Sequence, residues 1–325
     1  MKPYLRNTLT LFLVSLLLLA TACGTGSEGN GSGAESVKKE TPGPTRTVKS
    51  LKGDIQVPSS PKRVIGLSVV YPEFLSALGV TPVAIQNYHQ DFPSYLKTPF
   101  KNTLKMGIGE TPNFEAILSA APDLIIAPVW WADKVYDQLS KIAPTVLLPE
   151  REDWRDELRD IGEALDKKDI ADKAIADYEK QTADAKRKLH EAAGNDTVMY
   201  MMVMSKELVV YGENQSRGAF LHKELDLKPV SGFPKNELSV SISLEKLPEY
   251  NPDHIILQLD DSNDKEAQKK YQELQESAVW KNLKAVQNKR VYFMDGIEWF
   301  SVGMSLLANR NAIDDVLQAF QTKKQ

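Results

Sequence analysis

The sequence predicts an α/β protein built from two similar lobes with a ligand cleft between them. The first observation is an internal repeat, because Glu, a Pro-Asp pair and two Ile residues recur at the same spacing within 115–126 and 245–256. The second is an alternation of short apolar runs with helically spaced segments, which favours mainly parallel sheets covered by helices. The third is a long charged helical stretch between the two copies. Clefts between lobes are where small ligands commonly bind.

The N-terminal part is expected to be a targeting segment that lies outside the fold. Lys2 and Arg6 precede an apolar run at 9–22, which is shorter than the roughly twenty residues of a membrane-spanning helix. Cys23, the only cysteine of the chain, follows this run directly. We therefore predict a lipoprotein signal peptide at 1–22 and lipidation of Cys23; an ordinary cleaved signal peptide is the alternative.

Residues 23–47 are rich in Gly, Ser, Thr, Glu and Lys and bury too little apolar surface to order themselves, so they are predicted to form a flexible tether. The body that follows contains no cysteine and hence no disulfide, so its stability must come from packing. It is long enough for two lobes with cores of their own.

The first lobe is predicted at 48–156. Gly79 is placed to end one helix, and Asn113 is placed to cap the helix that carries Glu115. The expected strands are 63–68, 82–85, 124–127 and 144–148, and the expected helices are 71–78, one beginning at 113, and 134–139.

Residues 157–194 are predicted to form a linker and a spine helix between the lobes. The apolar face repeats at helical spacing, a break is expected around 166–169, and Gly194 is a stop signal. The second lobe is predicted at 195–325. Its expected strands are 197–204, 208–211, 255–259 and 290–293, and its expected helices are 216–225, 269–280 and 304–320.

Eight phrases along the body carry a resemblance to a known family. They are Pro61-Lys-Arg-Val, Ala77-Leu-Gly-Val, the first repeat, Ile142-Ala-Pro-Thr, Leu244-Glu, Trp280 through Val286, Arg290-Val-Tyr, and Trp299 to Gly303. In this order they resemble the iron-siderophore and vitamin B12 group of ABC-transporter substrate-binding proteins. The resemblance implies two Rossmann-like lobes joined by a single long helix, the class III type of periplasmic binding protein. It also implies a monomer that captures a ferric siderophore, needs no cofactor of its own, and delivers its ligand to a membrane permease served by a cytoplasmic ATPase. A lipid anchor would hold it on the extracellular face of the membrane, as in Gram-positive bacteria.

The repeated glutamates acquire a role from this resemblance. Glu115 and Glu245 match the positions at which the family docks into arginine pockets of the permease. Two carboxylates at equivalent places on two lobes can also straddle a two-subunit partner and set its orientation. The alternative is that both only complement the dipoles of the helices they begin.

Ligands of open α/β lobes sit at the carboxyl ends of the strands, and this rule selects the candidate binding residues. Trp130 and Trp131 follow an apolar strand directly; neighbouring side chains point in different directions, so one of them is expected to face the cleft. Trp299 and Phe300 make the same case on the second lobe. The full set is Tyr88, Lys105, Trp130, Trp131, Tyr211, Arg217, Trp299 and Phe300, with Tyr71 and His89 also considered.

The distribution of cations favours one siderophore class. Siderophore binders of the hydroxamate type often carry Arg where this chain has Gly109, and other relatives carry Arg in the strand where this chain has a methionine cluster at 199–204. Fewer arginines favour a hydroxamate or citrate-hydroxamate complex over a highly charged catecholate. Haem or a corrinoid is the alternative ligand, with His89 as the candidate axial ligand. Alternating methionines in a strand are usually core residues, which argues against copper.

Other classes of function find no support in the sequence. No nucleophile elbow, phosphate-binding glycine loop or metal-ligand spacing is present, so an enzyme is not expected. The four histidines are scattered, which argues against a site for a bare metal ion. The formal net charge of -4 gives no support for nucleic-acid binding.

Overall fold

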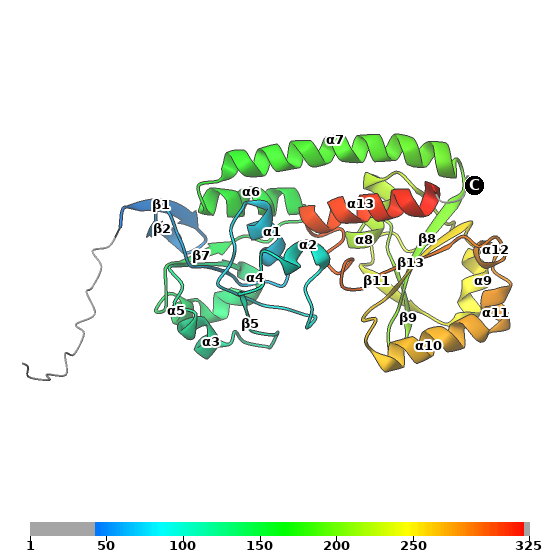
Figure 1. Ribbon diagram of the computed structural model, residues 1–325, viewed down its shortest axis with the longest axis horizontal. Coiled ribbons are helices and arrows are strands. Elements are labelled where there is room, and N and C mark those ends of the chain that lie inside the picture. Colours follow the sequence, from blue (N-terminus) through cyan, green and yellow to red (C-terminus); the bar gives the residue numbers. More distant parts are fainter. Residues whose placement is uncertain (1–42, 322–325) are drawn as a thin grey trace, which may run out of the picture. The chain divides into compact units, whose positions relative to one another are not determined.

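The computed structural model describes residues 43–321, and the predictions for Cys23 and for 1–42 lie outside them. The described chain begins with a hairpin of β1 (Thr45–Ser50) and β2 (Gly53–Pro58), which pair antiparallel (Figure 1). Val48 and Val57 of this hairpin are buried in the main core. The first strand therefore begins inside the predicted tether of 23–47, because its apolar residues have a core to pack against. No helix within 43–321 is long and apolar enough to cross a membrane.

The first lobe contains a five-stranded parallel sheet in the order β5-β4-β3-β6-β7. Asn113 caps α3 as predicted, since its side chain accepts from the Ala116 N–H at 3.0 Å. The elements are β3 (Val64–Gly66), α1 (Tyr71–Ala77), β4 (Ala84–Ile85), α2 (Ser94–Lys97), β5 (Leu104–Lys105), α3 (Phe114–Ser119), β6 (Leu124–Pro128), α4 (Val129–Ala132), η1 (Asp133–Val135), α5 (Tyr136–Leu139) and β7 (Thr145–Leu148).

Two helices then lead from the first sheet to the second. They are α6 (Trp154–Ala164) and α7 (Lys168–Ala193), and the break between them contains Asp166 at a positive φ of 57°. The 26-residue α7 is the single long helix that the sequence predicts, and it ends at Gly194, also with positive φ. Within residues 43–321, these two helices are the connection between the strands of the first sheet and those of the second.

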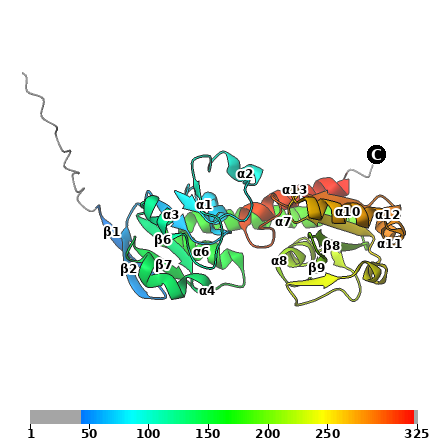
Figure 2. The ribbon, with the colours of Figure 1, turned by 90° about the horizontal axis from the view of Figure 1, so that it is seen from below.

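The second lobe contains a six-stranded sheet, and Figure 2 shows the two sheets as separate units. Its main path is β11-β9-β8-β12-β13, with β10 beside β8 and with β9 and β11 antiparallel to their neighbours. The elements are β8 (Thr197–Val203), β9 (Leu208–Tyr211), α8 (Ser216–Ala219), η2 (Phe220–Glu224), β10 (Lys228–Pro229), β11 (Ser239–Ile242), η3 (Leu244–Lys246), α9 (Leu247–Tyr250), β12 (His254–Leu259), α10 (Lys265–Glu276), α11 (Ala278–Lys281), α12 (Lys284–Gln287), β13 (Val291–Met294) and α13 (Leu306–Gln321).

The repeated Pro-Asp pairs have the same structural task in both lobes. The Asp123 carboxylate accepts from the N–H groups of Lys62 and Arg63 at 2.7 and 2.9 Å, just before β3. The Asp253 carboxylate accepts from the N–H and hydroxyl of Thr197 at 2.8 and 2.9 Å, at the start of β8. Each aspartate thus ties the start of one strand to its parallel neighbour, β3 to β6 and β8 to β12.

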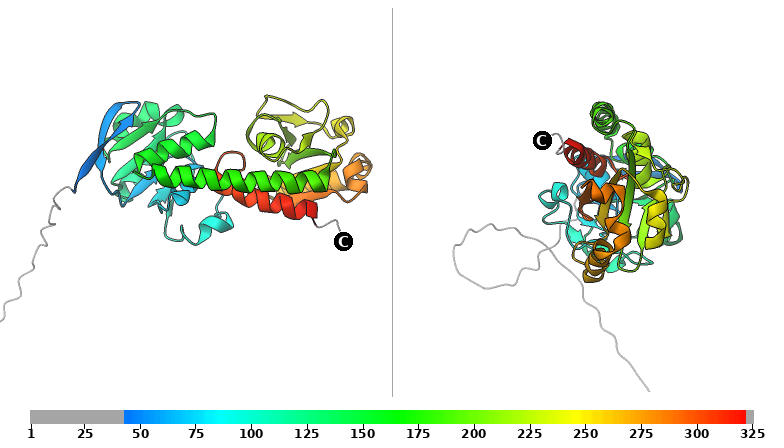
Figure 3. Two further views of the ribbon diagram at one scale, coloured as in Figure 1. Left: turned by 90° about the horizontal axis from the view of Figure 1, so that it is seen from above. Right: turned by 90° about the vertical axis from the view of Figure 1, so that its right-hand side faces the viewer.

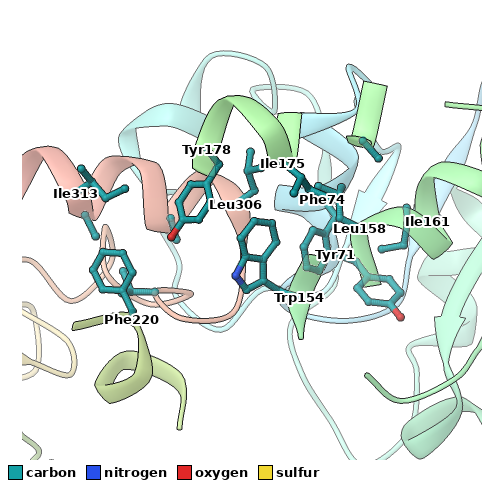
Figure 4. Close-up of a cluster of buried hydrophobic side chains, with 14 of the residues drawn as sticks. Tyr71, Phe74, Trp154, Leu158, Ile161, Ile175, Tyr178, Phe220, Leu306 and Ile313 are labelled. Atoms are coloured by element: carbon teal, nitrogen blue, oxygen red, sulfur yellow. The ribbon is translucent and has the colours of Figure 1, made fainter. Parts of the chain in front are cut away.

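One apolar core runs beneath both lobes. Figure 4 shows Phe74 of α1, Leu158 of α6, Tyr178 of α7, Phe220 of η2 and Ile313 of α13 within a single cluster. In addition, α13 lies beside α7 along its length and contacts α1 of the first lobe (Figure 3). Because this core is shared, large separation of the lobes would expose apolar surface, so the hinge is expected to be stiff.

Candidate functional site

An aromatic stack from the two lobes marks the cleft. Tyr88 follows β4, Phe300 follows β13, and their rings stack with centroids 5.0 Å apart. Tyr88 is 47% exposed although it is large and apolar in body, and Phe300 is partly buried. His89 packs edge-on against both rings. These side chains line a small hollow of about 40 Å³, which offers an aromatic wall to an organic ligand.

Arg217 is a cation that contacts the Phe300 backbone of this stack. It is buried, donates to the Phe300 carbonyl, and lies 5.0 Å from the ring centroid of Tyr211. Its Nε has no hydrogen-bond partner. Tyr211 in turn packs edge-on against buried Tyr200. The guanidinium is therefore held in one orientation between the Tyr211 ring and the loop that carries Phe300.

Two carboxylates that the sequence analysis missed lie near His89 of the stack. Asp260 and Asp261 follow β12 directly, and Asp261 lies 3.8 Å from Nδ1 of His89. Burial raises the pKa of Asp260, while the charges of His89 and Arg217 act in the opposite direction. The pKa of Tyr88 is raised, first by Asp260 and then by its own burial. The rule that selects residues at strand ends would have found both aspartates.

Lys105 is already engaged by its own lobe. Its ammonium donates to the Gln90 carbonyl and lies 4.3 Å from the ring centroid of Phe92. A ligand would have to compete with these contacts, so Lys105 stays a predicted binding residue without support from its position.

The two adjacent tryptophans behave differently from one another. They lie in α4 rather than in a loop. Trp130 is 62% exposed, whereas Trp131 is partly buried against the first lobe's core. Trp130 is therefore the member of the pair that is available to a ligand.

The structure contradicts the prediction that Trp299 lines the ligand site. It is 0% exposed, stacks on Tyr200 and donates from its indole N–H to Asp315 at 2.8 Å. The loop after β13 turns so that Phe300 points to the cleft and Trp299 points inward, where it is a core residue. Tyr71 is buried in the same core.

A larger cavity of about 1150 Å³ lies where the start of α6 faces α8. Arg155 of α6 forms an ion pair with Glu224 of the second lobe at 3.3 Å, and Glu224 also accepts from the Tyr178 hydroxyl. Ser216, at a positive φ of 43°, and Gly303 form part of the wall. The sequence analysis did not predict this cavity, because its residues come from segments that lie far apart in the chain.

The two predicted docking glutamates are exposed and occupy equivalent positions. Glu115 lies in the first turn of α3, and Glu245 lies in the first turn of η3. The pKa of Glu245 is lowered by its own backbone N–H and by Ser243. Both carboxylates are therefore available to a partner, although a purely local capping role fits the same positions.

No group of three or more His, Cys, Asp and Glu within 43–321 is arranged to hold a metal ion. The residues brought together at the cleft are instead aromatic rings, one buried guanidinium and two carboxylates. This set suits a bulky organic ligand with polar groups at its edge.

Comparison with known proteins agrees with this fold. The model of the periplasmic binding protein family matches residues 64–297, and the chain belongs to that family, which is one of binding proteins rather than enzymes. The chain is 32% identical to the probable siderophore-binding lipoprotein YfiY of Bacillus subtilis over the full length of both, and 31% identical to the iron(3+)-hydroxamate-binding protein FhuD of the same organism, over 89% of this chain and 90% of that protein. Among solved structures, Staphylococcus aureus SirA complexed with staphyloferrin B is 28% identical with a TM-score of 0.68, covering 85% of this chain and 98% of SirA.

Proposed function

We propose that this protein is the substrate-binding lipoprotein of an ABC importer and that it captures a ferric siderophore for a membrane permease. The observation that carries this is the aromatic-walled cleft between two lobes in a chain whose relatives are named for siderophore and ferric hydroxamate binding. The iron arrives already chelated, so no side chain has to ligate the metal. That agrees with a cleft of aromatic rings rather than metal ligands.

The charge of the cleft supports a hydroxamate or citrate-hydroxamate complex. Arg217 is the cation held at the stack, and Asp260 and Asp261 lie near it. A highly anionic catecholate complex would meet these carboxylates at close range, and such like charges repel. Phe300, Tyr88, Trp130 and Tyr211 would contact the organic scaffold.

Delivery would use the exposed glutamates on each lobe. Opposite charges on the permease would orient the protein, and only the correct lobe separation would engage Glu115 and Glu245 together. Replacing both by Ala should abolish transport while siderophore binding stays intact. Unchanged transport in that double variant would leave the two glutamates with a capping role only.

The anchor and the boundaries complete the proposal. Lipidation of Cys23 would tether a monomeric body to the extracellular face of the membrane. The first lobe, the linker with its spine helix, and the second lobe would correspond to 48–156, 157–194 and 195–325, with the β1 hairpin added to the first lobe.

Tryptophan fluorescence of the body from residue 43 onward tests the function directly. The chain has five tryptophans, and Trp130 is exposed. The titration panel contains ferric hydroxamate, citrate-type and catecholate siderophores, haemin and cobalamin. Saturable quenching by a ferric hydroxamate, and none by its iron-free form, is the expected result. Binding of haemin or cobalamin alone would overturn the ligand, and a Soret band that shifts in His89→Ala would then identify haem.

A further inference from the structure

The segment 295–305 leaves β13 of the second lobe, yet it is fastened to the first lobe. The Glu298 carboxylate accepts from the N–H and hydroxyl of Ser94 at 2.7 and 2.9 Å. Phe300 stacks on Tyr88. At the end of the segment, the Ser305 hydroxyl donates to the carboxylate of Glu73 on α1. The loop that presents Phe300 to the cleft is thus held by partners from the opposite lobe.

Glu73 is the most deeply placed of these partners. It is 4% exposed, and its carboxylate accepts from the Ala308 N–H at 3.2 Å and from the Tyr95 hydroxyl at 3.3 Å, in addition to Ser305. Ala308 lies in the first turn of the 16-residue α13, where unpaired N–H groups and the helix dipole favour a negative charge. A buried carboxylate with three donors is held in a fixed position.

The chain between Ser305 and Phe300 has little freedom of its own. The Gly303 N–H donates to the Asn309 side chain at 2.6 Å, which ties the segment to α13. Arg217 donates to the Phe300 carbonyl from the other side. A displacement of the α13 start would therefore be passed along this short stretch to the Phe300 ring.

We propose that Glu73 is a positioning residue of the ligand site, which fixes the start of α13 across the lobe boundary and so holds Phe300 against Tyr88 without touching the ligand. The consequence is that the aromatic stack moves with the first lobe although half of it belongs to the second. This inference rests on the proposed function for its effect on siderophore binding, but the hold on the segment can be measured without any ligand.

Hydrogen exchange of the ligand-free protein gives that measurement. Glu73→Ala removes the acceptor for all three donors, and exchange in peptides covering 295–308 should become about tenfold faster. Glu73→Gln keeps the shape and one acceptor oxygen but places an amide NH₂ group where the second acceptor oxygen was, so it should give a smaller increase in the same peptides. This second variant decides the question if Glu73→Ala fails to fold.

Glu224→Gln is the matched control for exchange. Its carboxylate also bridges elements across the lobe boundary, but its ion pair and hydrogen bond go to Arg155 and Tyr178 rather than to residues 295–305. It should lower the melting temperature without changing exchange in 295–308. The proposal would be overturned if peptides 295–308 exchanged at the same rate in Glu73→Gln as in wild type. It would also be overturned if Glu224→Gln sped up exchange in these peptides as much as Glu73→Gln does.

Binding separates a positioning role from a merely structural one. With ferrioxamine B as the probe, at a temperature well below melting, Glu73→Gln should weaken binding about threefold through faster dissociation. In a Phe300→Ala background the same change should have no further effect, because Glu73 acts through that ring. Full additivity of the two changes would contradict the inference. If wild type binds none of the siderophores, the proposed function fails, while the exchange result still decides whether Glu73 holds the segment.

Discussion

Replacement of Asp253 by Asn tests whether the repeated Pro-Asp pair is a structural device of each lobe. The carboxylate holds the N–H and hydroxyl of Thr197 and forms an ion pair with Lys284. Burial opposes ionisation of Asp253, but Lys284 and the Thr197 donors outweigh it and lower the pKa from 3.8 to about 2. Asn would keep the shape and one acceptor oxygen, but it would lose the charge.

The size of the effect follows from this pKa. A depression of about two units corresponds to roughly 2.4 kcal/mol of favourable interaction with the charged form. The Lys284 side chain is 53% exposed, so solvent and salt screen its part of that figure. We therefore expect Asp253→Asn to reduce the free energy of unfolding by about 1–2 kcal/mol at pH 7.

Urea denaturation of the body between pH 7 and pH 3 measures this difference. A lowered pKa means that the stabilisation is complete above about pH 4 and is lost as the pH falls towards 2, so the gap between wild type and variant should narrow below pH 4. Asp123→Asn is the matched control, because Asp123 also holds a strand start but forms no ion pair within residues 43–321. Its cost should be insensitive to salt, whereas that of Asp253→Asn should shrink in 1 M salt. A gap at Asp253 below 0.5 kcal/mol at pH 7, or one that does not depend on pH, would refute the reasoning.

Three further changes probe the site and its support. Trp299→Phe removes the indole donor to Asp315, so the free energy of unfolding should fall by about 1–3 kcal/mol in urea, and an unchanged value would return Trp299 to the surface of the cleft. Trp130→Ala should weaken siderophore binding severalfold in fluorescence titrations while the melting temperature stays constant, because the ring is exposed; equal binding would remove it from the site. Gly303→Ala should lower the melting temperature by several degrees, because Gly303 has φ +82° and an added Cβ would overlap the backbone of Ser216, and an unchanged melting temperature would contradict this.

The sequence predicted the two-lobe architecture because its signals are local and repeated. The cap at Asn113 and the stop at Gly194 each act within a few residues of their position, so pattern alone locates them. The Pro-Asp repeat is visible because its spacing recurs in the sequence, although each Asp ties strands that lie far apart in the chain. The same holds for α7, whose apolar face is set by helical spacing.

The candidate site was less predictable because it depends on contacts between distant segments. The loop after β13 offers two neighbouring aromatics, and only the packing of Tyr200 and Asp315 decides that Trp299 turns inward and Phe300 outward. The sequence predicts that Lys105 is available to a ligand, yet its ammonium donates to the Gln90 carbonyl. Strand-end position identifies which loops meet, but it does not determine how their side chains share the space.

The shared core constrains how this protein can respond to a ligand. The buried cluster passes from α1 through α6, α7 and α13 into η2 without interruption, so wide opening would expose side chains such as Phe74 and Phe220 at a cost of about 1.5–3 kcal/mol each. Recognition must then rely on local adjustments of the 295–305 segment and of the exposed rings, which would have to enlarge the hollow of about 40 Å³ at the stack. A permease that reads such a protein cannot depend on a large change in lobe separation. If Glu115 and Glu245 dock as proposed, the permease would have to detect small shifts in the distance between them. A stiff body would transmit a small movement at the cleft to these two glutamates.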